Sequence, residues 1–194
     1  MIHSILYAAD NGASIINISL TTFGAAQTSS YNSNYDEAVR YASIRGSLIV
    51  AASGNGDITE HRGQNLDIYP QSPVCNDGAI DGVLGVGALD ILLRPAVFSN
   101  FGAKCVDLYA PGSQITTTDI NGYAAYDGTS FATPIVSGVA ALIRSEYPEL
   151  KPREIISLLK KTSWKGVLDA KTAFDFFASN NKSNNQTASF ASNK

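Results

Sequence analysis

The sequence predicts an α/β fold in which a mostly parallel sheet forms the middle of three layers, with helices on both of its faces. Short runs of β-branched and other apolar residues alternate along the chain with segments of helical periodicity. This alternation is typical of parallel strands joined by crossover helices. The 194 residues are also 44% hydrophobic and 16% charged, which supplies enough apolar material for the core of one globular domain.

In the first part of the chain, helices and strands are separated by typical stop signals. Asn11-Gly12 ends one helical pattern and Gly46 ends another, and a segment rich in Thr, Ser, Gly, Asn and Gln lies between them. The predicted elements, in order, are a helix over residues 2–12, a strand over 14–20, a surface loop over 21–34, a helix capped by Asn34 or Asp36, and a strand over 47–52.

The second part of the chain continues the alternation after a long polar loop. Its predicted elements are the loop over residues 57–82, a strand over 83–89, a strand pair over 95–100 and 105–109, a tight turn at Asn121-Gly122, a buried helix after Ser130, a helix that starts at Lys151, and a short helix near 170–177 that packs through Phe174 and Phe177.

The last residues differ in composition from the rest. We expect residues 1–178 to form one domain and residues 179–194, almost entirely Ser, Asn, Lys, Gln, Thr and Ala, to form a disordered polar tail or linker. Asn181 and Asn185 match the glycosylation pattern, but such matches arise by chance in a tail of this composition.

Charge and hydropathy exclude several classes of partner. The net charge of −3 gives no reason to expect nucleic acid, and no apolar run is long enough for a transmembrane helix. No signal-peptide pattern begins the chain. Cys75 and Cys105 either form a disulfide or stay two unpaired thiols, and neither they nor the two histidines have metal-ligand spacing.

Residues 128–134 (Gly-Thr-Ser-Phe-Ala-Thr-Pro) place a serine where a turn leads into the long helix. Gly128 allows a tight turn, Thr129 or Ser130 can cap the helix, and Pro134 is tolerated only near the first turn. The unpaired amides and the positive dipole end at a helix start stabilise nearby negative charge. Ser130 is therefore a candidate nucleophile for attack on a carbonyl, although a serine in this position is most often only a cap.

Asn55 is a second candidate, because Ser-Gly-Asn-Gly follows the predicted strand over residues 47–52. Ligands collect at the carboxyl ends of parallel strands, so polar groups that emerge there are functional candidates. A plain turn residue would explain the flanking glycines equally well.

The order of residues along the chain separates the known serine mechanisms. An α/β-hydrolase elbow requires G-x-S-x-G with a later histidine, but Ala132 stands in place of the second glycine and no histidine follows Ser130. A chymotrypsin-like order would allow His61 before the serine, yet alternating helices and strands do not suit a double β-barrel.

The segment around Ser130, followed by Val-Ser-Gly-Val-Ala-Ala-Leu at residues 136–142, resembles the nucleophile segment of the subtilisin family of serine peptidases. Residues 14–20, 50–56 and 98–112 resemble further segments of that family. The resemblance runs from about Met1 to about Phe177, and it implies a subtilisin-like fold and peptide-bond hydrolysis through an acyl-enzyme.

The resemblance assigns roles to particular residues of this chain. Ser130 would be the nucleophile, and Asn55 would stabilise the oxyanion together with the Ser130 N–H, with Thr129 in support. The pocket for the residue before the cut would be flanked by Ser19, Leu20, Ala52, Ser53 and Gly54, and the substrate main chain would be held as an added strand. The family usually has glycine where this chain has Thr21, and alanine or glycine where it has Ser53.

The largest departure from the family is an absence. An aspartate segment and a histidine segment precede the nucleophile in the subtilisin order, and neither is found in the 194 residues. We expect His3 and His61 to be ordinary surface histidines. The chain is therefore interpreted as the C-terminal portion of a catalytic domain, incomplete at its N-terminal side and inactive alone.

Three interpretations stay open: part of an active endopeptidase, a non-catalytic relative that binds peptides or uses a base from another chain, and a degenerate remnant. The resemblance implies a polypeptide substrate, a missing N-terminal half as partner in the same or another chain, and a secreted or extracytoplasmic location, with no nucleic-acid or membrane partner. No cofactor is expected; calcium is possible by resemblance, but no acidic cluster identifies ligands for it.

Overall fold

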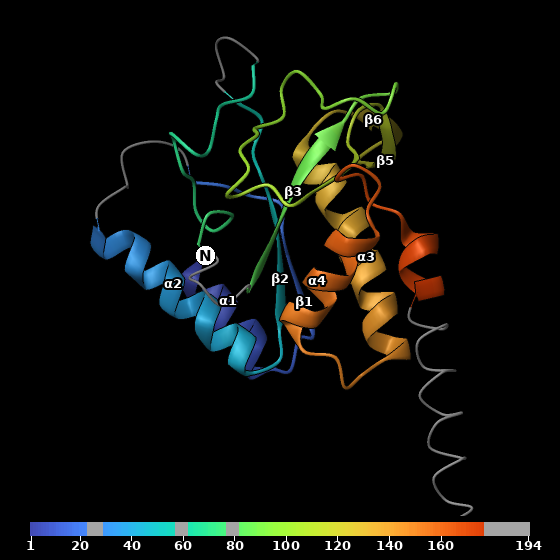
Figure 1. Cartoon of the computed structure of the whole chain (residues 1–194). Coiled ribbons are helices and arrows are strands. Elements are labelled where there is room, and N and C mark those ends of the chain that lie inside the picture. Colours follow the sequence, from blue (N-terminus) through green and yellow to red (C-terminus); the bar gives the residue numbers. More distant parts are fainter. Residues whose placement is uncertain (23–28, 57–61, 77–81, 177–194) are drawn as a thin grey trace, which may run out of the picture.

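The computed structural model describes residues 1–22, 29–56, 62–76 and 82–176. A four-stranded parallel sheet lies between two helical layers (Figure 1), which confirms the predicted fold class. The strands are β1 (Ile15–Ile18), β2 (Leu48–Ala52), β3 (Val83–Leu89) and β4 (Leu108–Pro111), and they lie side by side in this order.

The helices are divided between the two faces of the sheet (Figure 1). One face is covered by α1 (Ile2–Asp10) and α2 (Ser29–Ile44), and the other by α3 (Thr129–Glu146) and α4 (Pro152–Thr162). A further helical segment spans residues 170–176 and packs Phe174 against the core beside α4. Phe177, predicted to pack there too, lies outside the described residues, as does the predicted tail.

Strand β2 connects the two cores. Leu48 and Val50 pack with α3 and α4, whereas Ile49 and Ala51 pack with α1 and α2, because successive side chains of a strand point to opposite faces. Every residue of β2 and β3 is buried, as expected for parallel strands that helices cover on both faces. Burial of each large aliphatic side chain contributes about 1.5–3 kcal/mol.

Helix α3 packs across all four strands, but it is not buried on every side as its composition predicts. Its inward face carries Ala132, Val136, Ala140 and Ile143, all fully buried. On the outward face, Leu142 is 59% exposed, because α4 covers only part of α3. Apolar composition therefore overstates the burial of this helix.

Two other boundaries differ from the prediction. Helix α2 begins at Ser29 rather than at Asn34 or Asp36, since a helix anchored on the sheet extends into weak helix formers at little cost. Residues 95–100 do not form a strand: Pro95 makes one isolated bridge to Leu89, and β4 pairs with β3 instead. Pro95 lacks the N–H that a ladder requires.

A short antiparallel hairpin joins the sheet to α3. Its strands are β5 (Ile115–Asp119), which the sequence reasoning missed, and β6 (Gly122–Tyr126). The turn consists of Ile120 and Asn121, one residue before the predicted pair. The Tyr126 ring stacks on Phe131 of α3, with ring centroids 5.7 Å apart, so the hairpin is attached directly to the helix that carries Ser130.

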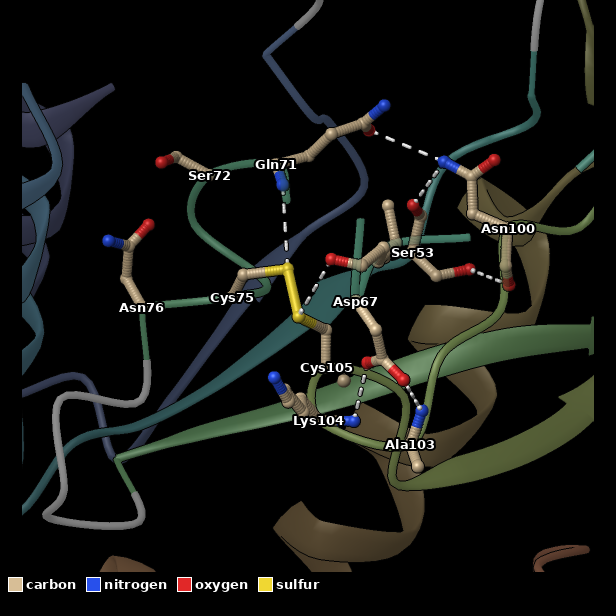
Figure 2. The surroundings of a disulfide bond; sticks show 12 residues. Ser53, Asp67, Gln71, Ser72, Cys75, Asn76, Asn100, Ala103, Lys104 and Cys105 are labelled. Carbon is tan, nitrogen blue, oxygen red and sulfur yellow. Dashed lines mark hydrogen bonds between the residues drawn. A yellow bond between two sulfur atoms is a disulfide. The ribbon is translucent and has the colours of Figure 1, made fainter. Parts of the chain in front are cut away.

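The two cysteines form a disulfide between the loop after β2 and the loop before β4 (Figure 2). The sequence left open whether these cysteines pair, and in the structure they form a disulfide.

Across the described ranges, no helix combines the length and apolarity needed to cross a bilayer. Nor do those ranges gather three His, Cys, Asp or Glu side chains into a metal site.

Candidate active site

Ser130 is the second residue of α3 and is half-buried. The N-cap is Gly128, and no side chain caps the helix, so the expectation that Thr129 or Ser130 caps it is wrong. The Thr129 hydroxyl instead bonds to Asn55 and Gly54. Within the described part of the chain, no protein group accepts the Ser130 N–H, which leaves it as a donor at the helix start.

Ser19, directly after β1, holds Ser130 through two reciprocal hydrogen bonds. The Ser19 hydroxyl donates to the Ser130 carbonyl at 3.0 Å, and the Ser130 hydroxyl donates to the Ser19 carbonyl at 3.1 Å. The Ser130 carbonyl can accept this bond because its regular helical partner, four residues on, is Pro134, which has no N–H. The proline thus frees the atom by which β1 positions Ser130.

Asn17 and Ser137 extend this contact into a chain of hydrogen bonds between β1 and α3. The Ser137 hydroxyl donates to Asn17 Oδ1 at 2.8 Å, and Asn17 Nδ2 donates to the Ser19 hydroxyl at 3.0 Å. Ser137 is buried, one turn beyond Thr133 on α3. Four polar side chains therefore fix the helix start against the end of β1.

Asn55 lies beside the helix start with its side-chain oxygen already engaged. Its Oδ1 accepts the Thr129 N–H at 2.9 Å and the Thr129 hydroxyl at 2.8 Å. A Cβ added at Gly128 would lie 3.2 Å from Asn55 Nδ2, so the amide packs directly against the turn. Because the oxygen is held, Nδ2 is the atom left to donate to a ligand.

The backbone that carries Asn55 is fixed by a buried polar cluster (Figure 2). Asn100 Nδ2 donates to the Ser53 carbonyl at 2.8 Å and to Gln71 Oε1 at 3.4 Å. The Ser53 hydroxyl donates to the Asn100 carbonyl at 3.1 Å, and the Asn100 N–H donates to the Gly54 carbonyl at 2.9 Å. These bonds satisfy buried polar groups that would otherwise destabilise the fold.

The residues predicted for a substrate pocket are placed in different ways. Leu20 is 65% exposed beyond β1, whereas Ala52 and Ser53 are buried, and the Ser53 hydroxyl is used inside the protein. Gly54 has a φ of 95°, a conformation that glycine adopts without strain. Hence Ser130, Ser19, Thr129, Asn55 and Gly54 gather at the helix start, while the side chains of Ala52 and Ser53 are buried inside the protein.

His3 is not part of this cluster. His3 is exposed on α1, on the opposite face of the sheet from α3, and His61 lies outside the described residues.

Asp127, just before Gly128, accepts two hydrogen bonds. The Ser113 hydroxyl donates to it at 2.6 Å and the Gln114 N–H donates to it at 2.7 Å. These two hydrogen bonds, that of Ser113 first, lower the pKa of Asp127 below its ordinary value.

Sequence reasoning missed Asn17, Ser137, Asn100 and Gln71. Each bonds to a partner far along the chain, up to 120 residues away for Ser137 and Asn17. The signal that the sequence offered was the position of Asn17 inside an otherwise apolar strand.

A parallel sheet between helical layers, with a serine at the first turn of a helix that packs across all four strands, fits the subtilisin-type serine peptidases. The chain belongs to this group: the Subtilase family matches residues 1–191.

Individual relatives agree with the family. The chain is 40% identical over 144 residues to the thermophilic serine proteinase of Bacillus sp. (strain AK1), covering 74% of this chain and 31% of that protein. It is 35% identical over 164 residues to subtilisin DY of Bacillus licheniformis, covering 84% and 54%. The chain thus spans about half or less of the length of these relatives.

Solved structures show the same likeness. A cold adapted subtilisin-like serine proteinase superposes with a TM-score of 0.69 at 32% identity, over 88% of this chain and 56% of that one. A protease of Pseudoalteromonas arctica PAMC 21717 gives a TM-score of 0.73 at 28% identity, over 89% and 56%.

Proposed function

We propose that this chain carries the nucleophile and the oxyanion hole of a subtilisin-type serine endopeptidase. The observation that supports this most directly is the geometry of Asn55, whose oxygen is engaged by Thr129 so that its Nδ2 is left as a donor beside Ser130. An amide donor next to a serine at a helix start is what a developing oxyanion requires.

In the proposed reaction, Ser130 Oγ attacks the carbonyl carbon of a peptide bond and its proton passes to a base. The carbonyl oxygen becomes an oxyanion that accepts hydrogen bonds from Asn55 Nδ2 and the Ser130 N–H. Collapse of this intermediate expels the amine, which takes up the proton, and leaves an acyl-enzyme on Ser130. Water then attacks the acyl group and releases the acid. Ser19, Leu20 and residues 52–54 would flank the substrate. Leu20 and residues 52–54 would contact it through their main-chain groups.

The proposed base is a histidine supplied from outside these 194 residues, together with its aspartate. His3 is on the opposite face of the sheet, and Ser130 instead donates its proton to a backbone carbonyl, that of Ser19. A carbonyl is not a base that can accept the proton during attack. The chain alone is therefore proposed to be inactive, with the rest of the domain as its necessary partner.

We further propose an extracytoplasmic location. The disulfide between Cys75 and Cys105 suits an oxidising compartment. A relative 39% identical over 160 residues, which make up 82% of this chain and 16% of that protein, is named a cell wall-associated protease of Bacillus subtilis.

The first test compares the purified chain with Ser130→Ala in peptide-ester hydrolysis. We expect both to give negligible turnover, because a triad serine without its base loses about 10⁶-fold in turnover. Robust hydrolysis that disappears in Ser130→Ala would contradict the need for an external base.

The second test uses a fluorophosphonate probe, which reports the reactivity of the serine itself. We expect slow labelling of Ser130, identified by mass spectrometry of the labelled peptide, and none in Ser130→Ala. Asn55→Leu should slow labelling by about 10²-fold, the size of effect known for the asparagine of subtilisin, which we borrow for this chain. Labelling that is equally fast in Asn55→Leu would remove the proposed oxyanion role. Peptide binding without any labelling would favour the alternative of a non-catalytic peptide-binding relative.

A further inference from the structure

A basic surface lies at the end of α3 opposite to Ser130. Two adjoining hollows of about 540 and 440 Å³ share Arg153 at their border. Together they are lined by six of the 14 basic residues of the chain. These residues, called the basic groove below, are Arg40, Arg144, Lys151, Arg153, Lys160 and Lys161.

The groove is a built feature of the fold, because Arg144 fixes its floor. Its guanidinium donates to the Gly46 carbonyl at 3.2 Å and also to the Leu150 carbonyl. Gly46 follows α2 and Leu150 precedes α4, so this one side chain joins three helices at the first hollow. The hollow therefore has a defined shape rather than being a gap between mobile side chains.

Two of its arginines have no carboxylate partner among the residues that the structure describes. In the described ranges, no carboxylate pairs with Arg40 of α2 or Arg153 of α4, and both side chains are exposed. Glu154 is engaged in capping α4 through the Lys151 N–H. Glu149 is the acidic residue among those that line the two hollows, so the cations clearly outnumber it.

The second hollow continues the positive charge along α4. Arg153, Ser157, Lys160 and Lys161 lie at spacings of four, seven and eight residues, which places them on one side of the helix. Lys160 pairs with Asp107, and Lys161 lies 4.7 Å from the centroid of the Phe176 ring. Within the described ranges, the groove cations that form neither a salt bridge nor a contact with an aromatic ring therefore include Arg40, Lys151 and Arg153.

The chemistry of the groove favours a short acidic segment over a long polyanion. The whole chain carries a net charge of −3, so its long-range field repels a polyanion, whereas local cations dominate within a Debye length of about 8 Å. Ile44, which lines the first hollow, is 76% exposed. It offers an apolar surface that a peptide side chain can contact and that a sugar–phosphate backbone cannot use.

We propose that the basic groove is a docking site for an acidic polypeptide segment. Arg153 and Lys161 are about 12 Å apart along α4, which an extended peptide covers in about four residues. A segment of about eight residues, with carboxylates interspersed among apolar residues, would fill both hollows. Because Arg144 is about 21 Å from Ser130 along α3, this site is separate from the candidate active site and does not depend on Ser130 being catalytic.

The test is a binding titration of the 194-residue chain with a fluorescent peptide of alternating glutamate and leucine, read by anisotropy. We expect saturable binding that weakens as salt rises from about 50 to 300 mM. The double variant Arg40→Glu/Arg153→Glu should weaken binding about tenfold or more, because it replaces two charge-assisted contacts by repulsion.

The matched control is Lys104→Glu/Lys165→Glu, which changes the net charge equally at exposed residues that line neither hollow. We expect it to bind within about twofold of the unmodified chain. An equal loss of peptide affinity in both variants would show that net charge alone explains the effect, and it would overturn the proposal. So would binding of the glutamine counterpart of the peptide, or tighter binding of a single-stranded oligonucleotide or of anionic lipid vesicles. Circular dichroism and thermal unfolding of each variant establish that the comparison is made between folded chains.

Discussion

At the amino end of α3, polar side chains bond to one another and to backbone, whereas near its carboxyl end no carboxylate of the described ranges pairs with Arg40 or Arg153. Ser130 and Asn55 are positioned by Ser19 and Thr129. At the other end, Arg144 is engaged by backbone carbonyls, whereas Arg40 and Arg153 are exposed and form no salt bridge with a described residue.

The difference matches the two functions proposed for these regions. Attack on a carbonyl needs atoms held to within a fraction of an ångström, so neighbouring polar groups are used for positioning. Recognition of a charged segment needs unpaired charge at the surface and tolerates adjustable side chains. Substitutions at the amino end should therefore alter stability and geometry together, and those in the basic groove should alter binding with little change in stability.

The largest expected effect comes from removing the disulfide with Cys75→Ala/Cys105→Ala. The bond closes a loop of 30 residues, so its loss should lower the free energy of unfolding by about 3–4 kcal/mol. It should also loosen the loops that hold Gln71 and Asn100 (Figure 2). Chemical denaturation measures the first effect. Native-state hydrogen exchange should show faster exchange at residues 53–55 than at the carboxyl end of α3; equal acceleration at both ends would contradict the local role.

Gly54→Ala is expected to destabilise by about 2–3 kcal/mol. Gly54 has a φ of 95°, and an added Cβ would lie 2.7 Å from Asn100 Nδ2 and 2.9 Å from Gln71 Oε1. The matched control is Gly138→Ala, in the exposed part of α3 with nothing within 4 Å of the new Cβ. It should stabilise the chain by about 0.5–1 kcal/mol through helix propensity. Urea unfolding measures the free energy of unfolding of both variants. An unchanged value for Gly54→Ala would contradict close packing of Gly54 against Asn100 and Gln71.

Thr129→Val removes the hydroxyl that joins Asn55 and Gly54 while keeping the shape of the side chain. We expect a loss of about 1–2 kcal/mol and slower fluorophosphonate labelling of Ser130, because Asn55 then loses one of its two anchors. Thr129→Ser keeps the hydroxyl and should restore labelling. If the valine variant labels at the normal rate, Thr129 does not position the oxyanion donor.

The smallest expected effect concerns the acid sensitivity of the turn before Gly128. Because Ser113 and Gln114 lower the pKa of Asp127 in the folded state, its contribution to stability is complete above the unfolded value of about 3.9 and is lost as pH falls through the lower folded value. In Asp127→Asn this contribution is absent. The difference in melting temperature between the two chains should therefore shrink below about pH 4. Melting curves that stay equally separated from pH 7 to about pH 3 would disprove this.

The sheet and its helices follow largely from local sequence. The runs at residues 47–52 and 83–89 predict β2 and β3 within a residue, because strands buried on both faces need continuous apolar side chains. Residues 95–100 mislead for a related reason. They are apolar enough for a strand, yet Ser99 and Asn100 bond to backbone elsewhere, and such long-range bonds leave no local pattern.

The candidate site divides in the same way. Ser130 and Asn55 can be found from motifs, since each stands in a distinctive short segment, and their catalytic roles stay predictions. Asn17 and Ser137 cannot be found in this way, because their hydrogen bond depends on β1 and α3 being brought together across 120 residues. The basic groove is likewise invisible in the sequence, as it combines residues of α2, α3 and α4.

The pair of hydrogen bonds between Ser19 and Ser130 also says something about when the site forms. The two residues are 111 positions apart, so they meet only after β1, the intervening strands and the start of α3 have all been assembled. Contacts between distant parts of a chain are costly to close before the rest is in place. The hydrogen-bonded placement of Ser130 against Ser19 is thus a readout of global folding, since it requires β1 and α3 to be in their final positions.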